Sequence, residues 1–289
     1  MKIRKAVVTA AGWGTRFLPA TKAQPKEMLP LVDKPIIQYV IEEAVASGIK
    51  HIIIVTAIGK RAIEDHFDRS FELEHILQKK GNAELLGKLK SISDLADISY
   101  IRQKEQLGLG HAVLVTKELI GDEPFAVFLP DDLIQADVPA MKQMIEVYNR
   151  YQHSVIAVQP VAKEETKAYG IVAPKKIEDR VYQVVGLVEK PEPKDAPSNL
   201  GIVGRYILTP EVFGMLEKTA PGKGGEIQLT DGLKLLLEKQ PMYAYQFEGI
   251  RYDTGTPLGF LKASVEFALN RPDVGAQFRE YLRHLKLTD

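Results

Sequence analysis

The chain has 289 residues, 45% of them apolar, and its 38 lysines and arginines balance 38 aspartates and glutamates to a formal net charge of zero. This length allows the core of one large α/β domain, and the zero net charge argues against a protein that binds nucleic acid or an anionic membrane through its overall field. Because there is no cysteine, disulfides, thiolate metal ligands and cysteine nucleophiles are excluded. No window approaches the roughly 18 apolar residues of a membrane span, so we expect an unprocessed cytoplasmic protein.

Strand-like and helix-like segments alternate along the chain. An apolar run at 3–11 ends in a glycine-rich turn, an amphipathic segment follows at 35–47, and a second apolar run covers 51–57. Further strands are predicted at 125–129, 154–161, 181–188, 200–208 and 242–247, and further helices at 110–118, 139–150, 211–218 and 227–239. This alternation predicts an α/β fold with a mostly parallel sheet that helices cover on both faces, and with ligands beyond the carboxyl ends of the strands.

Two regions lack this alternation. Residues from about 60 to 96 are rich in charge and helical in character, so we expect a helical excursion from the sheet. From about residue 256 to 289 we expect C-terminal helices, the first of them beginning near Pro257, because proline favours the first helical position. No repeat or low-complexity linker divides the chain, so residues 1–289 are predicted to form a single domain.

A glycine-rich segment follows the first predicted strand. Gly12 and Gly14 would let backbone N–H groups approach phosphate oxygens, while Arg16 and Lys26 add the positive charge that a triphosphate needs. The segment is not a Walker A loop, and Phe17 stands where a dinucleotide-binding fingerprint has its third glycine, so a nicotinamide-dependent oxidoreductase is only a distant alternative. The predicted nucleotide contacts in this segment are Ala11, Gly12, Gly14, Thr15, Arg16 and Lys26.

The order Gly-x-Gly-Thr-Arg-x-x-Pro at 12–19, with Pro-Lys-Glu-Met-Leu-Pro at 25–30, resembles the signature of the sugar-phosphate nucleotidyltransferases. The resemblance covers almost the whole chain and is greatest to the branch of the family that transfers a uridylyl group. It implies a Rossmann-like nucleotidyltransferase fold, α/β with a mixed, mostly parallel central sheet flanked by helices. It also implies that UTP and glucose 1-phosphate are the substrates, that UDP-glucose and pyrophosphate are the products, and that the enzyme is a homodimer or homotetramer.

Later segments carry side chains suited to a base and to a metal ion. The Gln103 amide offers a donor and an acceptor that match the edge of uracil, and the resemblance implies that Gln103 and Gly108 read the base. Asp131 and Asp132 follow a predicted buried strand, and carboxylate oxygens suit magnesium. The resemblance implies that Mg²⁺ is the cofactor and that Asp131 and Asp253 are its ligands, whereas the Asp132 side chain should point to the opposite side.

The resemblance also implies a set of sugar-binding residues. Gly170 and Gly201 would place backbone beside the sugar, and Glu189 would accept hydrogen bonds from its hydroxyls. Lys190 would bind the sugar phosphate, and Glu226 would lie near a sugar hydroxyl or a helix start.

The implied reaction is an in-line attack by an oxygen of the sugar phosphate on the α-phosphorus of UTP, with pyrophosphate as the leaving group. Because this oxygen is already anionic at neutral pH, no general base is needed, and catalysis should consist of positioning and charge neutralisation. The predicted catalytic residues are therefore Arg16, Lys26, Asp131 and Lys190. Two alternatives stay open at this point: a dTTP-dependent glucose-1-phosphate thymidylyltransferase, and a catalytically silent nucleotide-sensing subunit on the same fold.

Overall fold

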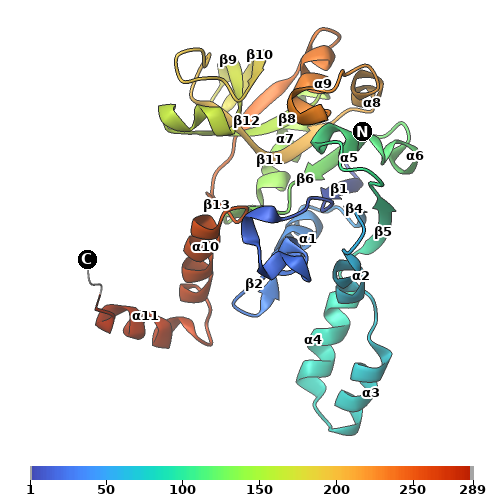
Figure 1. Cartoon of the computed structure of the whole chain (residues 1–289), viewed down its shortest axis with the longest axis vertical. Helices are drawn as coiled ribbons and strands as arrows, with labels where there is room; N and C mark the ends of the chain where they lie inside the picture. Colours follow the sequence, from blue (N-terminus) through green and yellow to red (C-terminus); the bar gives the residue numbers. More distant parts are fainter. Residues whose placement is uncertain (1, 287–289) are drawn as a thin grey trace.

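A mixed β-sheet forms the centre of the computed structural model, which describes residues 2–286 (Figure 1). Within these residues the sheet has nine strands in the order β5-β4-β1-β6-β11-β8-β12-β10-β9. Strands β5 to β6 of this order are parallel to one another, whereas β11 runs antiparallel to β6 and β8, and β10 runs antiparallel to β12 and β9. A mixed sheet flanked by helices confirms the predicted α/β fold class, but the sheet is not mostly parallel, because four of the eight neighbouring strand pairs in this order are antiparallel. The strands are β1 (Lys5–Thr9), β4 (His51–Thr56), β5 (Asp97–Arg102), β6 (Phe125–Phe128), β8 (Val155–Pro160), β9 (Gly170–Glu178), β10 (Val181–Glu189), β11 (Leu200–Leu208) and β12 (Tyr243–Gln246).

The parallel half of the sheet determines where distant parts of the sequence meet. Strands β1, β4 and β6 are short apolar runs in which nearly every side chain is buried. Because parallel strands end at the same edge of a sheet, the segments that follow β1, β5 and β6 come together at that edge. These segments carry Gly12, Gln103 and Asp131. Three of the predicted motifs therefore converge through strand order alone.

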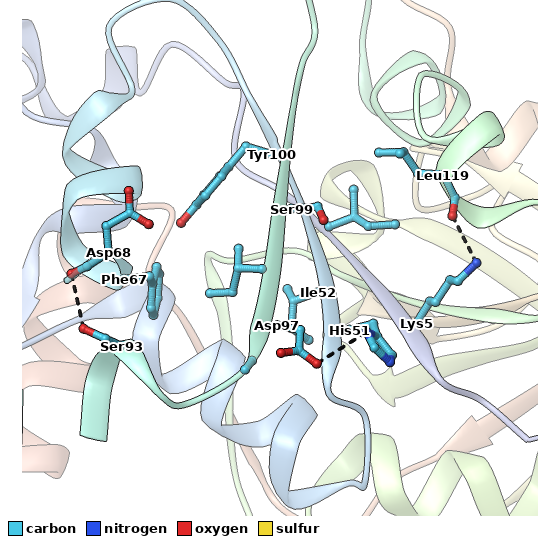
Figure 2. Close-up of a pocket in the computed structure, with 13 residues that line it drawn as sticks. Lys5, His51, Ile52, Phe67, Asp68, Ser93, Asp97, Ser99, Tyr100 and Leu119 are labelled. Carbon is cyan, nitrogen blue, oxygen red and sulfur yellow. Dashed lines mark hydrogen bonds and ion pairs between the residues drawn. The ribbon is translucent and has the colours of Figure 1, made fainter. Parts of the chain in front are cut away.

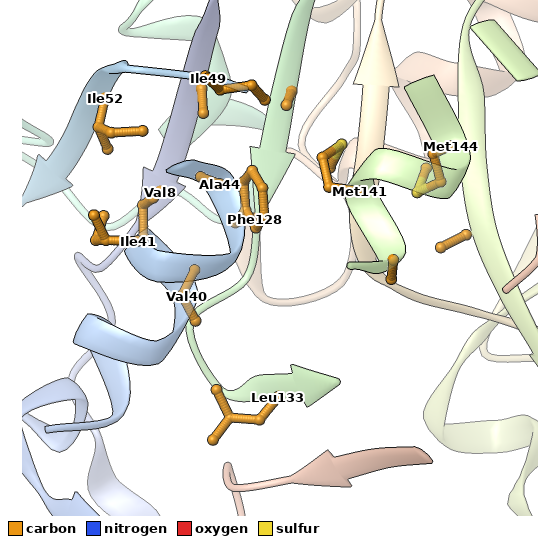
Figure 3. Close-up of a cluster of buried hydrophobic side chains, with 14 of the residues drawn as sticks. Val8, Val40, Ile41, Ala44, Ile49, Ile52, Phe128, Leu133, Met141 and Met144 are labelled. Atoms are coloured by element: carbon orange, nitrogen blue, oxygen red, sulfur yellow. The ribbon is translucent and has the colours of Figure 1, made fainter. Parts of the chain in front are cut away.

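Helices pack on both faces of the sheet. On one face, α1 and α7 bury side chains such as Val8 and Phe128, which Figure 3 shows pointing toward α1 residues Val40 and Ala44. On the other face, α5, α8 and α9 bury side chains that include Val7. Val7 and Val8 of β1 thus pack into the apolar layers on opposite faces of the sheet, because side chains alternate along a strand. The helices of these layers are α1 (Ile36–Ala46), α5 (Leu109–Leu114), α7 (Ala140–Tyr151), α8 (Glu211–Leu216) and α9 (Leu229–Leu237).

Other elements lie outside these layers. Figure 1 shows α3 and α4 as an arm that extends from one end of the molecule, and α10 and α11 as a second arm beside β13. None of the helices in residues 2–286 is both long and apolar enough to cross a membrane. The predicted C-terminal helical region runs to residue 289, of which residues 287–289 lie outside the described part. The remaining α-helices and strands of the described residues are α2 (Arg61–Phe67), α3 (Phe71–Lys79), α4 (Ala83–Ser93), α6 (Lys117–Ile120), α10 (Pro257–Leu269), α11 (Gly275–His284) and the short strands β2 (Pro30–Leu31), β3 (Lys34–Pro35), β7 (Asp132–Gln135) and β13 (Ile250–Asp253).

Six strands in the structure have no counterpart among the predicted strands: β2, β3, β5, β7, β9 and β13. Strands β2 and β3 are only two residues long and pair with each other. Strand β5 is the edge of the sheet and none of its side chains is fully buried, so it lacks the apolar run that marks an inner strand. Strands β7 and β13 pair only with each other and are four residues long. Strand β9 begins with buried residues but continues into exposed lysines. Each of these strands is held by its neighbours, which a pattern of hydrophobicity along one segment does not reveal.

Candidate active site

A cavity of about 500 Å³ opens beyond the carboxyl ends of β1 and β6. Its walls come from the segments that follow β1, β5 and β6 and from the segment that precedes α9. The fold thus gathers most of the predicted nucleotide-binding residues around one space. The predicted site residues in its lining are Ala11, Gly12, Gly14, Thr15, Lys26, Gln103, Gly108, Asp131 and Glu226.

A second cavity of about 510 Å³ lies at the opposite edge of the sheet (Figure 2). It is lined by the first residues of β1, β4 and β5, where His51 lies 3.6 Å from Asp97 and Lys5 donates a hydrogen bond to the Leu119 carbonyl. Among the described residues that line it, none is a predicted site residue. The amino ends of parallel strands are also not the edge at which α/β sheets bind ligands. The cavity beyond β1 and β6 is therefore the candidate site.

The glycine-rich loop after β1 exposes its backbone to this cavity. Gly14 has φ of 68°, and a Cβ there would lie 3.3 Å from both Lys26 Cβ and Thr21 Cγ2, so the turn requires glycine. The Thr21 hydroxyl donates a 2.8 Å hydrogen bond to the Gly14 carbonyl and fixes the turn. At Gly12, by contrast, an added Cβ would meet no atom of the described residues within 4 Å. Backbone at Gly12 is thus open to a ligand such as a phosphate group.

Lys26 and Asp131 form an ion pair at the base of the loop, with 2.6 Å between Nζ and Oδ2. Burial opposes the charge on Lys26, but the carboxylates of Asp131 and Glu27 outweigh this effect and raise the pKa of Lys26. Burial likewise opposes the charge on Asp131, but the charge and hydrogen bond of Lys26 hold the pKa of Asp131 below its ordinary value. Both groups are therefore charged at neutral pH, which is the state needed to bind phosphate and metal.

Asp131 and Asp253 converge on Gly255. A Cβ at Gly255 would lie 2.9 Å from Asp131 Oδ2 and 3.0 Å from Asp253 Oδ1. Thr254 holds the two segments together, since its N–H and its hydroxyl donate to the Asp131 carbonyl at 2.8 and 2.9 Å. Asp253 Oδ1 accepts the Gly255 N–H at 2.9 Å. Two hard carboxylate oxygens around a space that only glycine leaves open fit Mg²⁺, which usually takes one or two carboxylates and fills its remaining positions with phosphate and water oxygens.

Gln103 and Gly108 form the other wall of the cavity. The buried Gln103 amide donates to the Gly108 carbonyl at 3.1 Å and lies 3.0 Å from His111 Nδ1, so the side chain is held in place. Gly108 has φ of 92°, and a Cβ there would lie 2.8 Å from Glu226 Cβ. The predicted sugar-binding residue Glu226 thus lies beside the predicted base-reading residues and lines the same cavity. Close packing of the segment that holds Glu226 explains why Gly108 must be glycine.

The other predicted sugar-binding residues lie at the ends of β9, β10 and β11. Gly170 pairs with Glu189, whose Oε2 would lie 3.2 Å from a Cβ on Gly170. The Lys190 ammonium lies 3.3 Å from Glu189 Oε1, and the Lys190 N–H donates to the Tyr169 carbonyl at 2.9 Å. A Cβ on Gly201 would lie 3.2 Å from Tyr169 Cγ. The sheet therefore brings Gly170, Glu189, Lys190 and Gly201 together around Tyr169, although none of these four lines the cavity described above.

Arg16 does not line the cavity. Its guanidinium donates a 3.4 Å hydrogen bond to the Gly255 carbonyl, on the loop where Asp131 and Asp253 converge. Arg16, a predicted contact of the triphosphate, therefore lies near these carboxylates, and the residue is exposed.

Two buried arginines of the site region were not predicted. Arg251 forms an ion pair with Asp132, whose Oδ2 accepts the Gly204 N–H at 2.7 Å. Arg205 is fully buried in β11 and forms an ion pair with Glu43, 2.6 Å apart, while also donating to the Asp132 carbonyl at 2.8 Å. A charged residue inside an otherwise apolar strand was a usable signal for Arg205, because buried charges need partners. Nothing near Arg251 in the sequence distinguishes it from a solvated arginine.

Comparison with known proteins identifies the family of the chain. Residues 5–269 match the model of the nucleotidyl transferase family. The UTP–glucose-1-phosphate uridylyltransferase of Bacillus subtilis strain 168 is 57% identical over 284 residues, which cover 98% of this chain and 97% of that protein. A UDP-glucose pyrophosphorylase complexed with UDP-glucose is 47% identical with a TM-score of 0.86 and covers 93% of this chain and 100% of its own. UTP-bound UGPase from Acinetobacter baumannii is 42% identical with a TM-score of 0.92, over 98% and 100% of the two chains. The chain belongs to the nucleotidyl transferase family.

Proposed function

We propose that this chain transfers the uridylyl group of UTP to glucose 1-phosphate and releases pyrophosphate and UDP-glucose. The observation that carries this proposal is the cavity in which the glycine-rich loop, Lys26, Asp131 and Gln103 meet. Relatives named as uridylyltransferases, and solved relatives that bind UTP and UDP-glucose, support uridylyl transfer over the dTTP-dependent alternative and over a silent subunit.

The chemistry follows from the charges at the site. An oxygen of glucose 1-phosphate forms a bond to the α-phosphorus of UTP, and the bond from that phosphorus to the bridging oxygen of pyrophosphate breaks. Because the attacking oxygen is anionic, the barrier comes largely from repulsion between the two phosphate groups. Lys26 and Arg16 place positive charge on the triphosphate, and the backbone around Gly12 and Gly14 approaches its oxygens. Lys190 neutralises the sugar phosphate.

Asp131 and Asp253 hold Mg²⁺ in this proposal. The ion, when bound, supplies positive charge to the phosphate oxygens of the nucleotide. Support comes from the two carboxylate oxygens that converge on Gly255. Within residues 2–286 no group of three or more acidic, histidine or cysteine side chains offers a complete metal site, so the phosphates and water would complete the coordination. Lys26, paired with Asp131, lies where it can move between that carboxylate and the nucleotide.

The base and the sugar are bound at different places. Gln103 and Gly108 contact uracil, and Ala11 and Thr15 contribute to the nucleotide side of the cavity. Gly170, Glu189 and Gly201 surround the glucose ring, and Glu226, which lines the cavity beside Gly108, approaches a sugar hydroxyl from there. Support for placing the base and the sugar apart comes from the different strand ends at which these residues lie.

The proposal extends to the domain, the location and the assembly of the enzyme. Residues 1–289 form one domain that works in the cytoplasm as a homodimer or homotetramer, without nucleic acid or membrane as a partner. The exposed apolar side chains of the two arms support self-association: Leu258 and Leu261 on α10 are 64% and 61% exposed, and Phe71 on α3 is 77% exposed.

A pyrophosphate-release assay tests the activity. Purified protein is given glucose 1-phosphate and each of four nucleoside triphosphates, with and without Mg²⁺. The expected result is a Mg²⁺-dependent signal that is strongest with UTP, and a Lys26→Ala variant that is slower by about a hundredfold. A signal that is strongest with dTTP would make dTTP, and not UTP, the nucleotide substrate. No pyrophosphate release with any nucleotide would contradict the proposal.

A further inference from the structure

One guanidinium joins three segments of the site region. Arg251 lies on β13, and β13 pairs with β7 so that Asp253 is opposite Asp132. Arg251 Nε donates to Asp132 Oδ1 at 2.6 Å, and Nη1 donates to the Tyr169 hydroxyl at 3.0 Å. Nη2 lies 3.9 Å from Asp253 Oδ2. The Arg251 side chain is 9% exposed, so these contacts are made away from bulk water.

Asp132 fixes the position of this guanidinium relative to the central sheet. Its Oδ2 accepts the Gly204 N–H of β11 at 2.7 Å, and its own carbonyl accepts a hydrogen bond from Arg205. A Cβ on Gly204 would lie 2.6 Å from that same oxygen, so the carboxylate fits closely against the strand. Arg251 is therefore attached to a closely packed part of the fold, and its hydrogen bond to the Tyr169 hydroxyl ties Tyr169 to that part.

Tyr169 lies at the centre of the proposed sugar side. Its carbonyl accepts the Lys190 N–H at 2.9 Å, and its ring lies over Gly201, where a Cβ would be 3.2 Å from Cγ. It directly precedes Gly170. The Arg251 guanidinium also lies 5.3 Å from the centre of the Tyr169 ring. A shift of Tyr169 would thus move the backbone that carries Lys190 and Gly170.

We propose that Arg251 is a positioning residue for the sugar phosphate: through the Tyr169 hydroxyl it holds the Gly170 and Lys190 segments at a fixed distance from the Asp131 and Asp253 carboxylates. The inference rests on the proposed uridylyl transfer. Neither Arg251 nor Tyr169 lines the nucleotide cavity. Loss of their contact should therefore weaken binding of the sugar portion and leave binding of the nucleotide portion unchanged.

The test compares UDP-glucose with UMP, which lacks both the glucose and the phosphate that comes from glucose 1-phosphate. Calorimetry gives the Kd of UDP-glucose and of UMP for the wild type and for Tyr169→Phe, which removes the hydroxyl and keeps the ring. The expected result is a Kd for UDP-glucose about tenfold higher, with the Kd of UMP within about twofold, because a hydrogen bond to a charged group is lost. In turnover, the KM for glucose 1-phosphate should rise by a similar factor and the KM for UTP should not.

Tyr182→Phe is the matched control. It removes a tyrosine hydroxyl of β10 that donates to Gln246 Oε1 at 3.3 Å, and Gln246 is not one of the proposed sugar-binding residues. It should leave both Kd values unchanged. Arg251→Lys, which keeps the charge beside Asp132 but loses the forked geometry, should reproduce the effect of Tyr169→Phe, and the double variant should add nothing further.

Two results would overturn the inference: an unchanged Kd for UDP-glucose in Tyr169→Phe, or an equal rise in the Kd values of UDP-glucose and UMP. If Arg251→Lys fails to fold, Tyr169→Phe decides alone. Wild-type protein that binds UDP-glucose but does not release pyrophosphate would contradict the proposed activity and not the role of Arg251, so the two failures are distinguishable.

Discussion

Replacing Gly255 with alanine tests whether Asp131 and Asp253 act together. The added Cβ would lie 2.9 Å from Asp131 Oδ2 and 3.0 Å from Asp253 Oδ1. Non-bonded carbon and oxygen atoms rarely approach closer than about 3.3 Å, so both carboxylates must retreat by roughly 0.3 Å. A misplacement of about 1 Å at an active site costs on the order of a hundredfold in rate, so a shift of this size in two ligands at once should cost about tenfold, or about 1.4 kcal/mol.

The assay is pyrophosphate release over a series of Mg²⁺ concentrations. Gly255→Ala should lower kcat/KM about tenfold and raise the Mg²⁺ concentration at half-maximal rate, because Mg²⁺ tolerates little distortion of its coordination. The control is Gly87→Ala on the exposed surface of α4, where an added Cβ meets no described atom within 4 Å. That variant should keep wild-type kinetics and gain up to about 1 kcal/mol in stability. Wild-type rate and Mg²⁺ dependence in Gly255→Ala would refute the placement of a metal between the two carboxylates.

Three further predictions concern the base of the loop. Gly12→Ala, which meets no described atom within 4 Å, should leave stability unchanged but raise the KM for UTP by about tenfold, as steady-state kinetics would show. Lys60→Met leaves the buried Glu27 carboxylate, now 2.7 Å from Lys60 Nζ, without its partner. It should lower the free energy of urea unfolding by about 3–5 kcal/mol, whereas the double variant with Glu27→Leu should lower it much less. Because the pKa of Asp131 is held below its ordinary value beside Lys26, the stability that this pair contributes should be present above about pH 4 and be lost as the pH falls through the lowered pKa. Unfolding of wild type and Asp131→Asn at pH 7 and pH 2 checks this, and a difference in unfolding free energy that is the same at both pH values would contradict it.

Sequence patterns identified the parts of the fold that apolar runs determine. The inner strands β1, β4, β6 and β11 are buried along most of their length, and their runs predicted them without ambiguity. The edge strand β5 and the ribbon of β7 with β13 were missed, because their side chains are partly polar and their pairing depends on segments far away in the chain. Hydrophobic pattern reports burial, so strands that are not buried escape it.

The site divides in the same way. The glycine-rich loop could be predicted because its residues are close together in sequence. Glycine is required at Gly14, where φ is 68°. The partnership of Lys26 with Asp131 joins residues 105 positions apart, and that of Arg251 with Asp132 joins residues 119 apart. No spacing rule covers such distances. The family resemblance placed Lys26 and Asp131 in the site with separate roles, but neither ion pair was predicted.

The register of the β7–β13 ribbon is the step that connects fold to chemistry. Asp253 is opposite Asp132 in this ribbon, and Thr254 follows by donating twice to the Asp131 carbonyl. A slip of one residue would turn Asp253 to the other face, because side chains alternate along a strand. The ion pair of Arg251 with Asp132 joins residues diagonal to each other on one face of the ribbon, so it forms only in the observed register. A buried charge pair outside the nucleotide cavity thus contributes to the register that brings Asp253 and Asp131 to the same glycine, Gly255.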